Sequence, residues 1–135
     1  DLNYELRIMN YDNSPKIHTF KDLSAWREAH TLVIDVYRVT KKLPREEHFG
    51  IVNQMRRAAV SVTSNIAEGF SRNSYKDKIQ FYAIAQGSLT ELESQLVVAR
   101  DLGYLLSTES TSIQEQTLKA HKILNGLLKS SKLRI

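Results

Sequence analysis

Apolar residues recur at steps of three and four along most of the chain, which is the spacing of one face of an α-helix. Proline, glycine and short polar residues interrupt this pattern near Pro44, Gly69 and Gly103. We therefore expect four helices, at about residues 22–42, 46–67, 74–102 and 108–129. Four helices with short connections predict an all-α protein, an antiparallel up-and-down four-helix bundle over residues 20–135.

Each expected helix carries an apolar stripe that we expect to be buried. In the last three helices the core positions are Val52, Met55, Ala59, Val62 and Ile66, then Tyr82, Ala85, Leu89, Leu92, Leu96 and Ala99, then Ile113, Thr117, Ala120, Leu124 and Leu127. Ser74 and Asp77 have the spacing of an N-terminal cap for the third helix, and Gly69 is expected to end the second.

Two helices carry more apolar surface than the centre of one bundle needs. The first has two stripes side by side, and the third has a second, weaker stripe with Gly87 near its edge. The members of that weaker stripe are Ile79, Ala83, Thr90 and Val97. This surplus predicts burial between subunits of a homo-oligomer, while the alternative is the scattered apolar surface that is normal in monomers.

The first nineteen residues follow a different pattern. Leu2, Tyr4, Leu6 and Ile8 alternate with polar residues, and this two-residue period predicts an extended arm or leader over residues 1–19. An isolated strand cannot satisfy its own backbone, so an ordered arm would pair with a neighbour or lie on the bundle.

The outer face of the second helix alternates charge with short hydroxyl side chains. Such residues allow another backbone to approach, which favours a polar seam against a partner over an ordinary solvated face. A glycine in the middle of the third helix likewise favours close backbone approach. We expect Glu93 to pair with Arg56 or Arg57 across the bundle. The interface or structural polar seam is assigned to Arg56, Arg57, Ser61, Asn65, Glu68, Gly87 and Glu93.

Composition narrows the class of protein. The 135 residues, 41% hydrophobic and 25% charged, suit a single folded domain. Apolar runs stay well short of the roughly 18 residues that suggest a membrane span, so we expect a cytoplasmic protein without a membrane partner. The absence of cysteine excludes disulfides, thiolate chemistry and cysteine-based zinc sites.

Motifs for catalysis are missing from the sequence. The four histidines are not placed in Glu-x-x-His or H-E-x-x-H spacing, and there is no Gly-rich phosphate loop or G-x-S-x-G elbow. Glu91 and Glu93 diverge by roughly 160° on a helix and cannot share a substrate. His30 could meet His121 across the bundle, although a packing role is commoner for such residues. We expect no enzymatic activity, no cofactor and no metal site.

The net charge of +4 is unevenly distributed. Residues 41–78 hold eight basic and four acidic residues, residues 79–118 one and five, and residues 119–135 five and none. Lysine and arginine in loops and tails neutralise phosphates without reading bases, although solvated surface lysines would give the same pattern. The residues that we expect to contact nucleic acid are Lys41, Lys42, Arg45, Arg72, Lys76, Lys129, Lys132 and Arg134.

Four motifs occur in a consistent order over about residues 20–130. They are Phe20-x-x-Leu23-x-x-Trp26-x-x-Ala29 followed by Pro44 and Phe49-Gly50, then Gln54-x-Arg56-Arg57-Ala58-Ala59-x-Ser61, then Asn65-Ile66-Ala67-Glu68-Gly69, and then Ala85-x-Gly87-Ser88-Leu89-x-Glu91-Leu92-Glu93. Together they resemble the four-helix-bundle proteins encoded in 23S ribosomal RNA intervening sequences, a bacterial family that includes the accessory protein of diversity-generating retroelements. The resemblance implies a ring-shaped homopentamer with no known catalytic activity, and a basic surface that engages nucleic acid in the retroelement branch.

These observations lead to one functional hypothesis and one alternative. The hypothesis is a non-enzymatic oligomeric helical scaffold that binds structured RNA or a ribonucleoprotein by low-specificity electrostatics. The alternative is a protein–protein interaction scaffold with no nucleic-acid role. The first predicts RNA affinity that falls steeply with salt, and the second predicts none.

Overall fold

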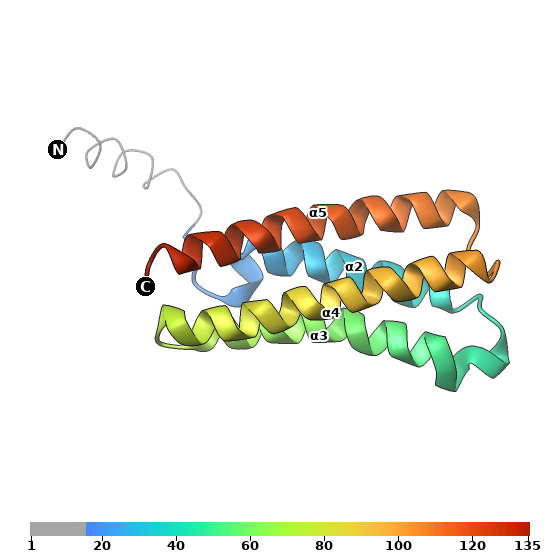
Figure 1. The fold of residues 1–135 in the computed structure, drawn as a ribbon, viewed down its shortest axis with the longest axis horizontal. Coiled ribbons are helices and arrows are strands. Elements are labelled where there is room, and N and C mark those ends of the chain that lie inside the picture. The colour runs from blue at the N-terminus through green and yellow to red at the C-terminus, as the bar shows by residue number, and fades with distance from the viewer. Residues whose placement is uncertain (1–15) are drawn as a thin grey trace.

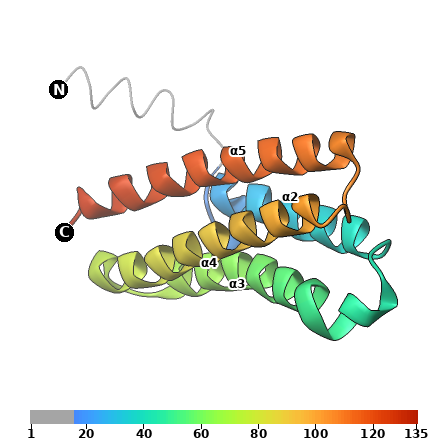
Figure 2. The same cartoon turned by 45° about the vertical axis from the view of Figure 1, so that its right-hand side comes forward.

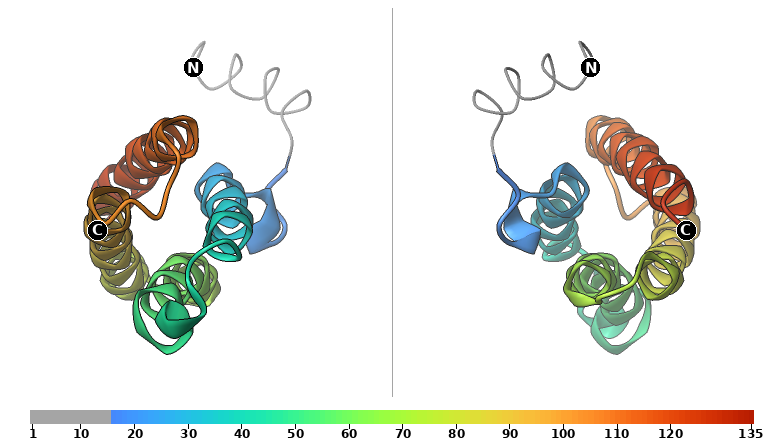
Figure 3. Two further views of the ribbon diagram at one scale, coloured as in Figure 1. Left: turned by 90° about the vertical axis from the view of Figure 1, so that its right-hand side faces the viewer. Right: turned by 90° about the vertical axis from the view of Figure 1, so that its left-hand side faces the viewer.

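The computed structural model describes residues 16–135, which form a bundle of four long helices (Figure 1). The helices are α2 (Ser24–Thr40), α3 (Asn53–Ser71), α4 (Tyr75–Asp101) and α5 (Ser107–Lys132). A short turn, η1 (Phe20–Asp22), precedes α2, and the turns η2 (Arg45–Glu47) and η3 (His48–Val52) precede α3. Seen end-on in Figure 3, the helices surround a common axis in chain order. The all-α antiparallel bundle is confirmed, whereas the expected N-terminal arm lies outside the described residues except for its last four positions.

The apolar stripes predicted from the sequence are the core of the bundle. All of the predicted core positions of α3 and α4 are buried, and so are those of α5 except Leu127, which is half-buried beside the buried Leu128. On α2 the buried stripe is Ala25, Ala29, Leu32, Val36 and Val39, continued by Leu43 beyond the helix end. The 3.6-residue period therefore identified the buried faces of the last three helices, and for the first helix the structure selects one of the two predicted stripes as the core.

The surplus apolar faces are divided between the margin of the core and the surface. Leu23 is buried, and Trp26, Val33 and Ile79 are half-buried against the core. Tyr37 of α2 is 39% exposed and Val97 of α4 is 38% exposed, and Ala83 and Thr90 are also exposed. A Cβ placed on Gly87 would have no atom of residues 16–135 within 4 Å outside its own helix turn. The close backbone approach expected at this glycine is therefore not made by the described part of the chain.

The second helix differs from its predicted course at both ends. It was expected to begin near Glu46, but the backbone leaves the helical region at Gly50 (φ −101°, ψ −118°) and α3 begins at Asn53. Glycine has little preference for helix and tolerates the backbone angles of this break, so the turns η2 and η3 do not join α3 in one continuous helix. The prediction that Gly69 ends the helix is also wrong. Gly69 is buried inside α3, and a Cβ there would lie 2.6 Å from Cε1 of Tyr82, so the glycine permits α4 to pack closely.

The remaining helix ends follow the predicted signals. Ser74 caps α4 because its hydroxyl accepts a hydrogen bond from the Asp77 amide at 3.2 Å. The α4–α5 connection turns at Gly103, whose φ of 81° favours glycine. Within residues 16–135, every helix lacks the length or the apolar character needed to cross a bilayer.

The up-and-down course of the chain defines two ends of the bundle (Figures 1 and 2). One, which we name the α3–α4 end, comprises residues 68–78 and 129–135. The other, named the α2–α3 end, comprises residues 41–47 and 100–109. Since α4 has 27 residues, the two ends lie about 40 Å apart.

Candidate nucleic-acid interface

The eight predicted phosphate-binding residues divide between the two ends of the bundle. Those at the α2–α3 end are Lys41, Lys42 and Arg45, and those at the α3–α4 end are Arg72, Lys76, Lys129, Lys132 and Arg134. The fold does not bring the two sets together. Within one protomer they form two separate surfaces, which have to be judged one at a time.

The α3–α4 end is strongly basic. Its six cationic residues are Arg72, Lys76, Lys78, Lys129, Lys132 and Arg134, and its two acidic residues are Glu68 and Asp77. The lysines at 76, 129 and 132 are exposed, and they make no ion pair with another residue in the range 16–135. This end therefore presents several uncompensated positive charges to solvent.

Aromatic rings position two of these cations. The Arg72 guanidinium carbon lies 4.5 Å from the centre of the Phe81 ring, and Arg72 also contacts the exposed carboxylate of Glu68 at 3.3 Å. Arg134 lies 5.5 Å from the Tyr75 ring centre, and its Nη1 donates a hydrogen bond to Tyr75 Oη at 3.3 Å. Cation–π contacts hold a guanidinium without neutralising it, so Arg134 adds its full charge to the positive surface, whereas the exposed Glu68 carboxylate offsets part of the charge of Arg72. The Arg134–Tyr75 contact also joins the end of the chain to the start of α4.

Lys78 has a structural role at the same end. Its Nζ donates to the backbone oxygen of Phe70 at 2.6 Å and to that of Gly69 at 3.4 Å. These carbonyls lie in the last turn of α3, where helix carbonyls lack partners and a cation is favourable. Lys78 therefore completes the α3–α4 turn more than it serves a ligand.

The α2–α3 end is close to neutral. Its basic residues are Lys41, Lys42, Arg45 and Arg100, and its acidic residues are Glu46, Glu47, Asp101 and Glu109. Lys42 forms an ion pair with Glu109, and this contact, together with the Leu106 amide that donates to Glu109 at 3.1 Å, holds the pKa of the Glu109 carboxyl below its ordinary value. Neighbouring carboxylates neutralise much of the basic cluster that the sequence predicts here.

Acidic residues also surround Tyr104 at this end. Desolvation raises the pKa of the Tyr104 hydroxyl, and the nearby carboxylates of Glu47 and Glu46 raise that pKa further. Both glutamates come from η2 and Tyr104 from the α4–α5 connection. The carboxylates around Tyr104 therefore lower the positive electrostatic potential at the α2–α3 end.

The predicted polar seam on α3 is divided among several contacts. Ser61 and Ser88 share a hydrogen bond of 2.8 Å between α3 and α4, and Asn65 donates to the Ser61 carbonyl at 2.8 Å. Arg56 turns to α2, where its Nε donates to Thr40 Oγ1 at 3.0 Å. Several side chains of the seam are therefore already hydrogen-bonded inside the protomer.

Glu93 does not pair with either arginine of α3. Its carboxylate contacts the imidazole of His121 of α5, so the predicted pairing with Arg56 or Arg57 is wrong. A 3.6-residue period places a side chain on a face of its helix but does not say which neighbouring helix that face meets. His30 stacks on Trp26, with ring centres 4.7 Å apart and planes 12° apart, rather than meeting His121.

Metal-binding geometry is not found in the described part of the chain. His121 and Glu93 contact each other, but among residues 16–135 no group of three or more His, Cys, Asp or Glu side chains is arranged to hold an ion.

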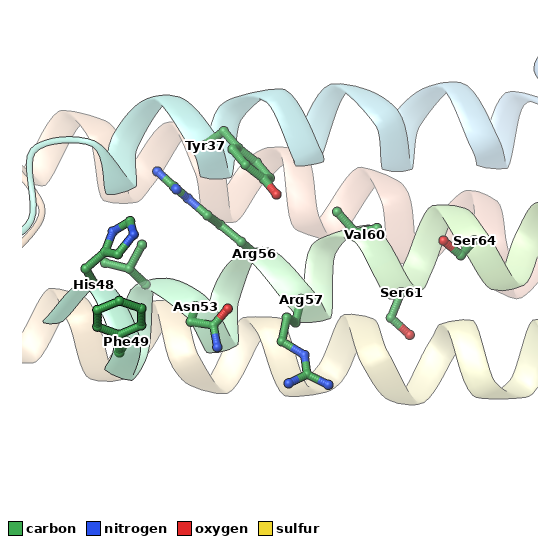
Figure 4. A pocket seen from close by; sticks show the side chains of 10 residues that line it. Tyr37, His48, Phe49, Asn53, Arg56, Arg57, Val60, Ser61 and Ser64 are labelled. Atoms are coloured by element: carbon green, nitrogen blue, oxygen red, sulfur yellow. The ribbon is translucent and has the colours of Figure 1, made fainter.

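The structure contains a groove between α2 and α3 that the sequence did not predict. Figure 4 shows its side chains, with Phe49 at one end, Arg56 crossing toward Tyr37, and Arg57 projecting from the outer face of α3. The groove has a volume of about 710 Å³, and Phe49 is 91% exposed. Helical periodicity placed Phe49 inside a continuous helix, so nothing singled it out as an exposed ring. The available signal was Gly50 directly after it.

The chain was compared with protein-family models, curated proteins and solved structures. Residues 21–126 match the family model described as 23S rRNA-intervening sequence protein. A crystal structure of a protein with unknown function from the S23 ribosomal protein family of Bacteroides thetaiotaomicron has a similar fold, with a TM-score of 0.72 at 22% sequence identity. That similarity covers 78% of this chain and 98% of the other chain. No curated protein matches.

Proposed function

Since the chain belongs to the family of 23S rRNA-intervening sequence proteins, we propose that it is a non-enzymatic, cytoplasmic helical scaffold that binds structured RNA or a ribonucleoprotein. In this proposal the RNA backbone is held by charge, with little preference for base sequence. The scaffold assembles from several copies of the chain, and the number five follows from the family resemblance.

The observation that carries the proposal is the charge difference between the two ends. The α3–α4 end has six cations against two carboxylates, while the α2–α3 end has four of each. RNA phosphates are attracted strongly to the α3–α4 end and only weakly to the α2–α3 end. The phosphate-contacting residues are therefore Arg72, Lys76, Lys129, Lys132 and Arg134.

Salt dependence follows from this assignment. Five phosphate contacts release about four to five condensed counterions, so the affinity is expected to fall by roughly 10²- to 10³-fold between about 50 and 200 mM salt. Binding should change little when the stem sequence of the RNA is scrambled, because the cations contact phosphates and not base edges.

The decisive experiment compares two triple variants that remove equal charge from opposite ends. Lys129→Gln, Lys132→Gln and Arg134→Gln should weaken binding of a fluorescently labelled RNA hairpin by on the order of 100-fold at low salt and reduce the salt slope by about three. The matched control, Lys41→Gln, Lys42→Gln and Arg45→Gln, should change affinity less than about fivefold. Fluorescence anisotropy measures both, with circular dichroism to check that each variant is folded.

Other outcomes have clear meanings. Equal losses of RNA affinity for the two triple variants would contradict the assignment of the phosphate-binding surface to the α3–α4 end. Wild-type protein that binds no RNA at either salt concentration would reject the RNA role and favour the scaffold for protein partners alone.

Self-association is proposed to use the outer face of α4. That face carries the exposed carboxylate of Glu91 near its middle, and its exposed small or apolar residues are Ala83, Ile84, Gly87, Thr90, Val97 and Val98. The open space at Gly87 would let another backbone approach, which recovers the cost of glycine in a helix. The face is thus suited to burial against a second copy.

Two exposed glycines provide a matched test of this face. Gly87→Glu should lower the mass measured by analytical ultracentrifugation, because it puts a charge in the contact. Gly126→Glu on α5 changes an equally open position and should leave the mass unchanged. An unchanged mass for Gly87→Glu would exclude this face as the contact, and Arg57→Glu would then test the predicted seam on α3.

A further inference from the structure

The groove between α2 and α3 combines side chains that are not used by the electrostatic surface at the α3–α4 end. Phe49 and Tyr37 supply aromatic rings, and Arg56 and Arg57 supply guanidinium groups. Its remaining lining is apolar or carries a hydroxyl, amide or imidazole, and none of the residues in the described range that line it carries a carboxylate. The groove therefore has the composition of a site for an anionic ligand with a flat ring.

Phe49 is exposed to an unusual degree for an aromatic residue. It is 91% exposed, and its T-shaped contact with the His48 ring, with centres 5.2 Å apart, can cover at most one of its two faces. The turn η3 carries it out of the bundle, because the backbone breaks at Gly50 directly after it. A free aromatic face beside cations is the arrangement on which unpaired bases stack in single-stranded nucleic-acid sites.

The two arginines of the groove differ in how they are held. Arg56 is fixed by its hydrogen bond to Thr40 and by stacking 4.5 Å from the Tyr37 ring centre. Arg57 is exposed and makes no hydrogen bond or ion pair with another residue of the described range 16–135. It also lines a second groove, of about 350 Å³ between α3 and α4. Its guanidinium is therefore available to an incoming phosphate.

We propose that the α2–α3 groove binds one unpaired nucleotide of an RNA, with its base stacked on Phe49 and its phosphate held by Arg57. Asn53 lies between these two residues in the groove and is placed to hydrogen-bond the base or ribose. The volume of about 710 Å³ is large enough for one nucleotide and within the usual range for small-ligand sites. This inference rests on the proposed RNA-binding function and adds a preference for looped over fully paired RNA.

The position of the groove agrees with such a preference. It begins at η3 and follows α3, whose 19 residues extend about 28 Å toward the basic α3–α4 end. One hairpin can then place its stem phosphates on the basic end and an unpaired base in the groove. A protein partner would have to supply a carboxylate for Arg57, since burying an unpaired guanidinium is costly.

The test compares Phe49→Leu with wild type on two RNAs, a hairpin with an unpaired loop and a blunt duplex of the same stem. Phe49→Leu keeps an apolar side chain but removes the ring. We expect about a tenfold loss of affinity for the hairpin and no change for the duplex, and Phe49→Trp should bind the hairpin as well as wild type. Leu118→Ala, which alters an exposed apolar residue of α5 outside the groove, is the control and should have no effect.

The salt dependence of the Phe49→Leu effect and the effect of Arg57→Gln distinguish base stacking in the groove from electrostatic binding at the α3–α4 end. The loss for Phe49→Leu should be nearly the same at low and physiological salt, because stacking releases no counterions. Arg57→Gln should weaken hairpin binding by severalfold, whereas Arg27→Gln, an exposed arginine of α2 outside the groove, should not. Wild-type affinity of Phe49→Leu for the hairpin overturns the inference while leaving the electrostatic binding intact.

Two other results would overturn it in different ways. A lower oligomer mass for Phe49→Leu would show that the groove is an interface between copies of the chain. Absence of binding to both RNAs by wild-type protein would reject the underlying RNA function as well.

Discussion

At the α3–α4 end of the bundle, cations stack on aromatic rings or project freely, whereas at the α2–α3 end the cations lie among an equal number of carboxylates. In sequence, residues 41–47 already carry Glu46 and Glu47 beside three cations, whereas residues 129–135 carry three cations and no acidic residue. The fold adds Glu109 to the first set, because it brings this residue beside Lys42 from 67 residues away. The charge of a surface therefore depends on the segments that the fold brings together as well as on the charge of each segment.

The two ends differ in packing as well. At the α3–α4 end, Gly69 allows the Tyr82 ring to contact the backbone of α3, and Lys78 closes the turn. At the α2–α3 end, two short turns and a break at Gly50 separate the helices, and Phe49 projects into solvent. Contacts that stabilise the bundle are thus buried at the α3–α4 end and exposed at the α2–α3 end. Substitutions at the two ends are therefore expected to change stability by different amounts.

The largest effect is expected from filling the contact at Gly69. A Cβ there would lie 2.6 and 2.8 Å from carbons of the Tyr82 ring, so Gly69→Val should lower the free energy of unfolding by about 3 kcal/mol or more. Gly126→Val, at an open position of α5, should change it by less than about 0.5 kcal/mol. Urea denaturation at fixed protein concentration measures both. Equal effects at the two glycines would contradict the close packing of this end.

Tyr82 should give the same end a sensitivity to alkali. Burial raises the pKa of its hydroxyl from 10 to about 12, so above pH 10 the unfolded chain loses this proton while the folded chain keeps it. Stability should therefore fall by about 2–3 kcal/mol between pH 10 and 12, and Tyr82→Phe should remove that part of the decline. Thermal melts at pH 7 and in this alkaline range give the comparison. Identical alkaline curves for the two proteins would argue against burial of the hydroxyl.

Two lysines sharpen the difference between buried and exposed contacts. Lys78→Met removes the donor to two carbonyls at the end of α3 and should cost about 1–2 kcal/mol. Lys42→Met removes an ion pair whose lysine side chain is 59% exposed, and it should cost less than about 1 kcal/mol. Denaturant midpoints rank the variants. A greater loss for Lys42→Met would reverse the assignment of strong and weak ends.

The smallest effect is expected in acid at the α2–α3 end. Because the folded-state pKa of Glu109 lies below its ordinary value, its contribution to stability is present at neutral pH and is lost as the pH falls through that folded-state value. Glu109→Gln should therefore be slightly less stable than wild type at pH 7, and the difference should disappear in acid. Melting curves over this range test the sign. A difference that grows on acidification would contradict it.

The sequence predicts the helices and their buried faces well because those depend on a local period. Met55, Leu89 and Leu124 are all buried, as their spacing requires. Glycine was harder to interpret. Gly69 and Gly87 both lie in helices, but Gly69 contacts a tyrosine ring from α4, whereas Gly87 has no such neighbour among residues 16–135. Periodicity carries no information about which helix packs opposite a given glycine.

The candidate site was only partly predictable for the same reason. The basic residues of the α3–α4 end were identified from charge alone, and the Arg134–Tyr75 contact that holds one of them was not. Phe49 was noticed only as part of a family motif, because its exposure depends on the break at Gly50. Partners that come from distant parts of the chain, such as His121 for Glu93, cannot be read from spacing.

The even number of antiparallel helices has a practical consequence for anyone labelling this protein. Residue 135 lies at the α3–α4 end, because α5 returns the chain to it, so a purification tag or fluorophore fused after this residue would sit beside the surface proposed to bind RNA (Figure 1). The turn at Gly103, exposed and about 40 Å away, is the better insertion point. In any assembly whose copies point the same way, every such insertion would appear on the opposite rim, which gives microscopy a direct marker of polarity.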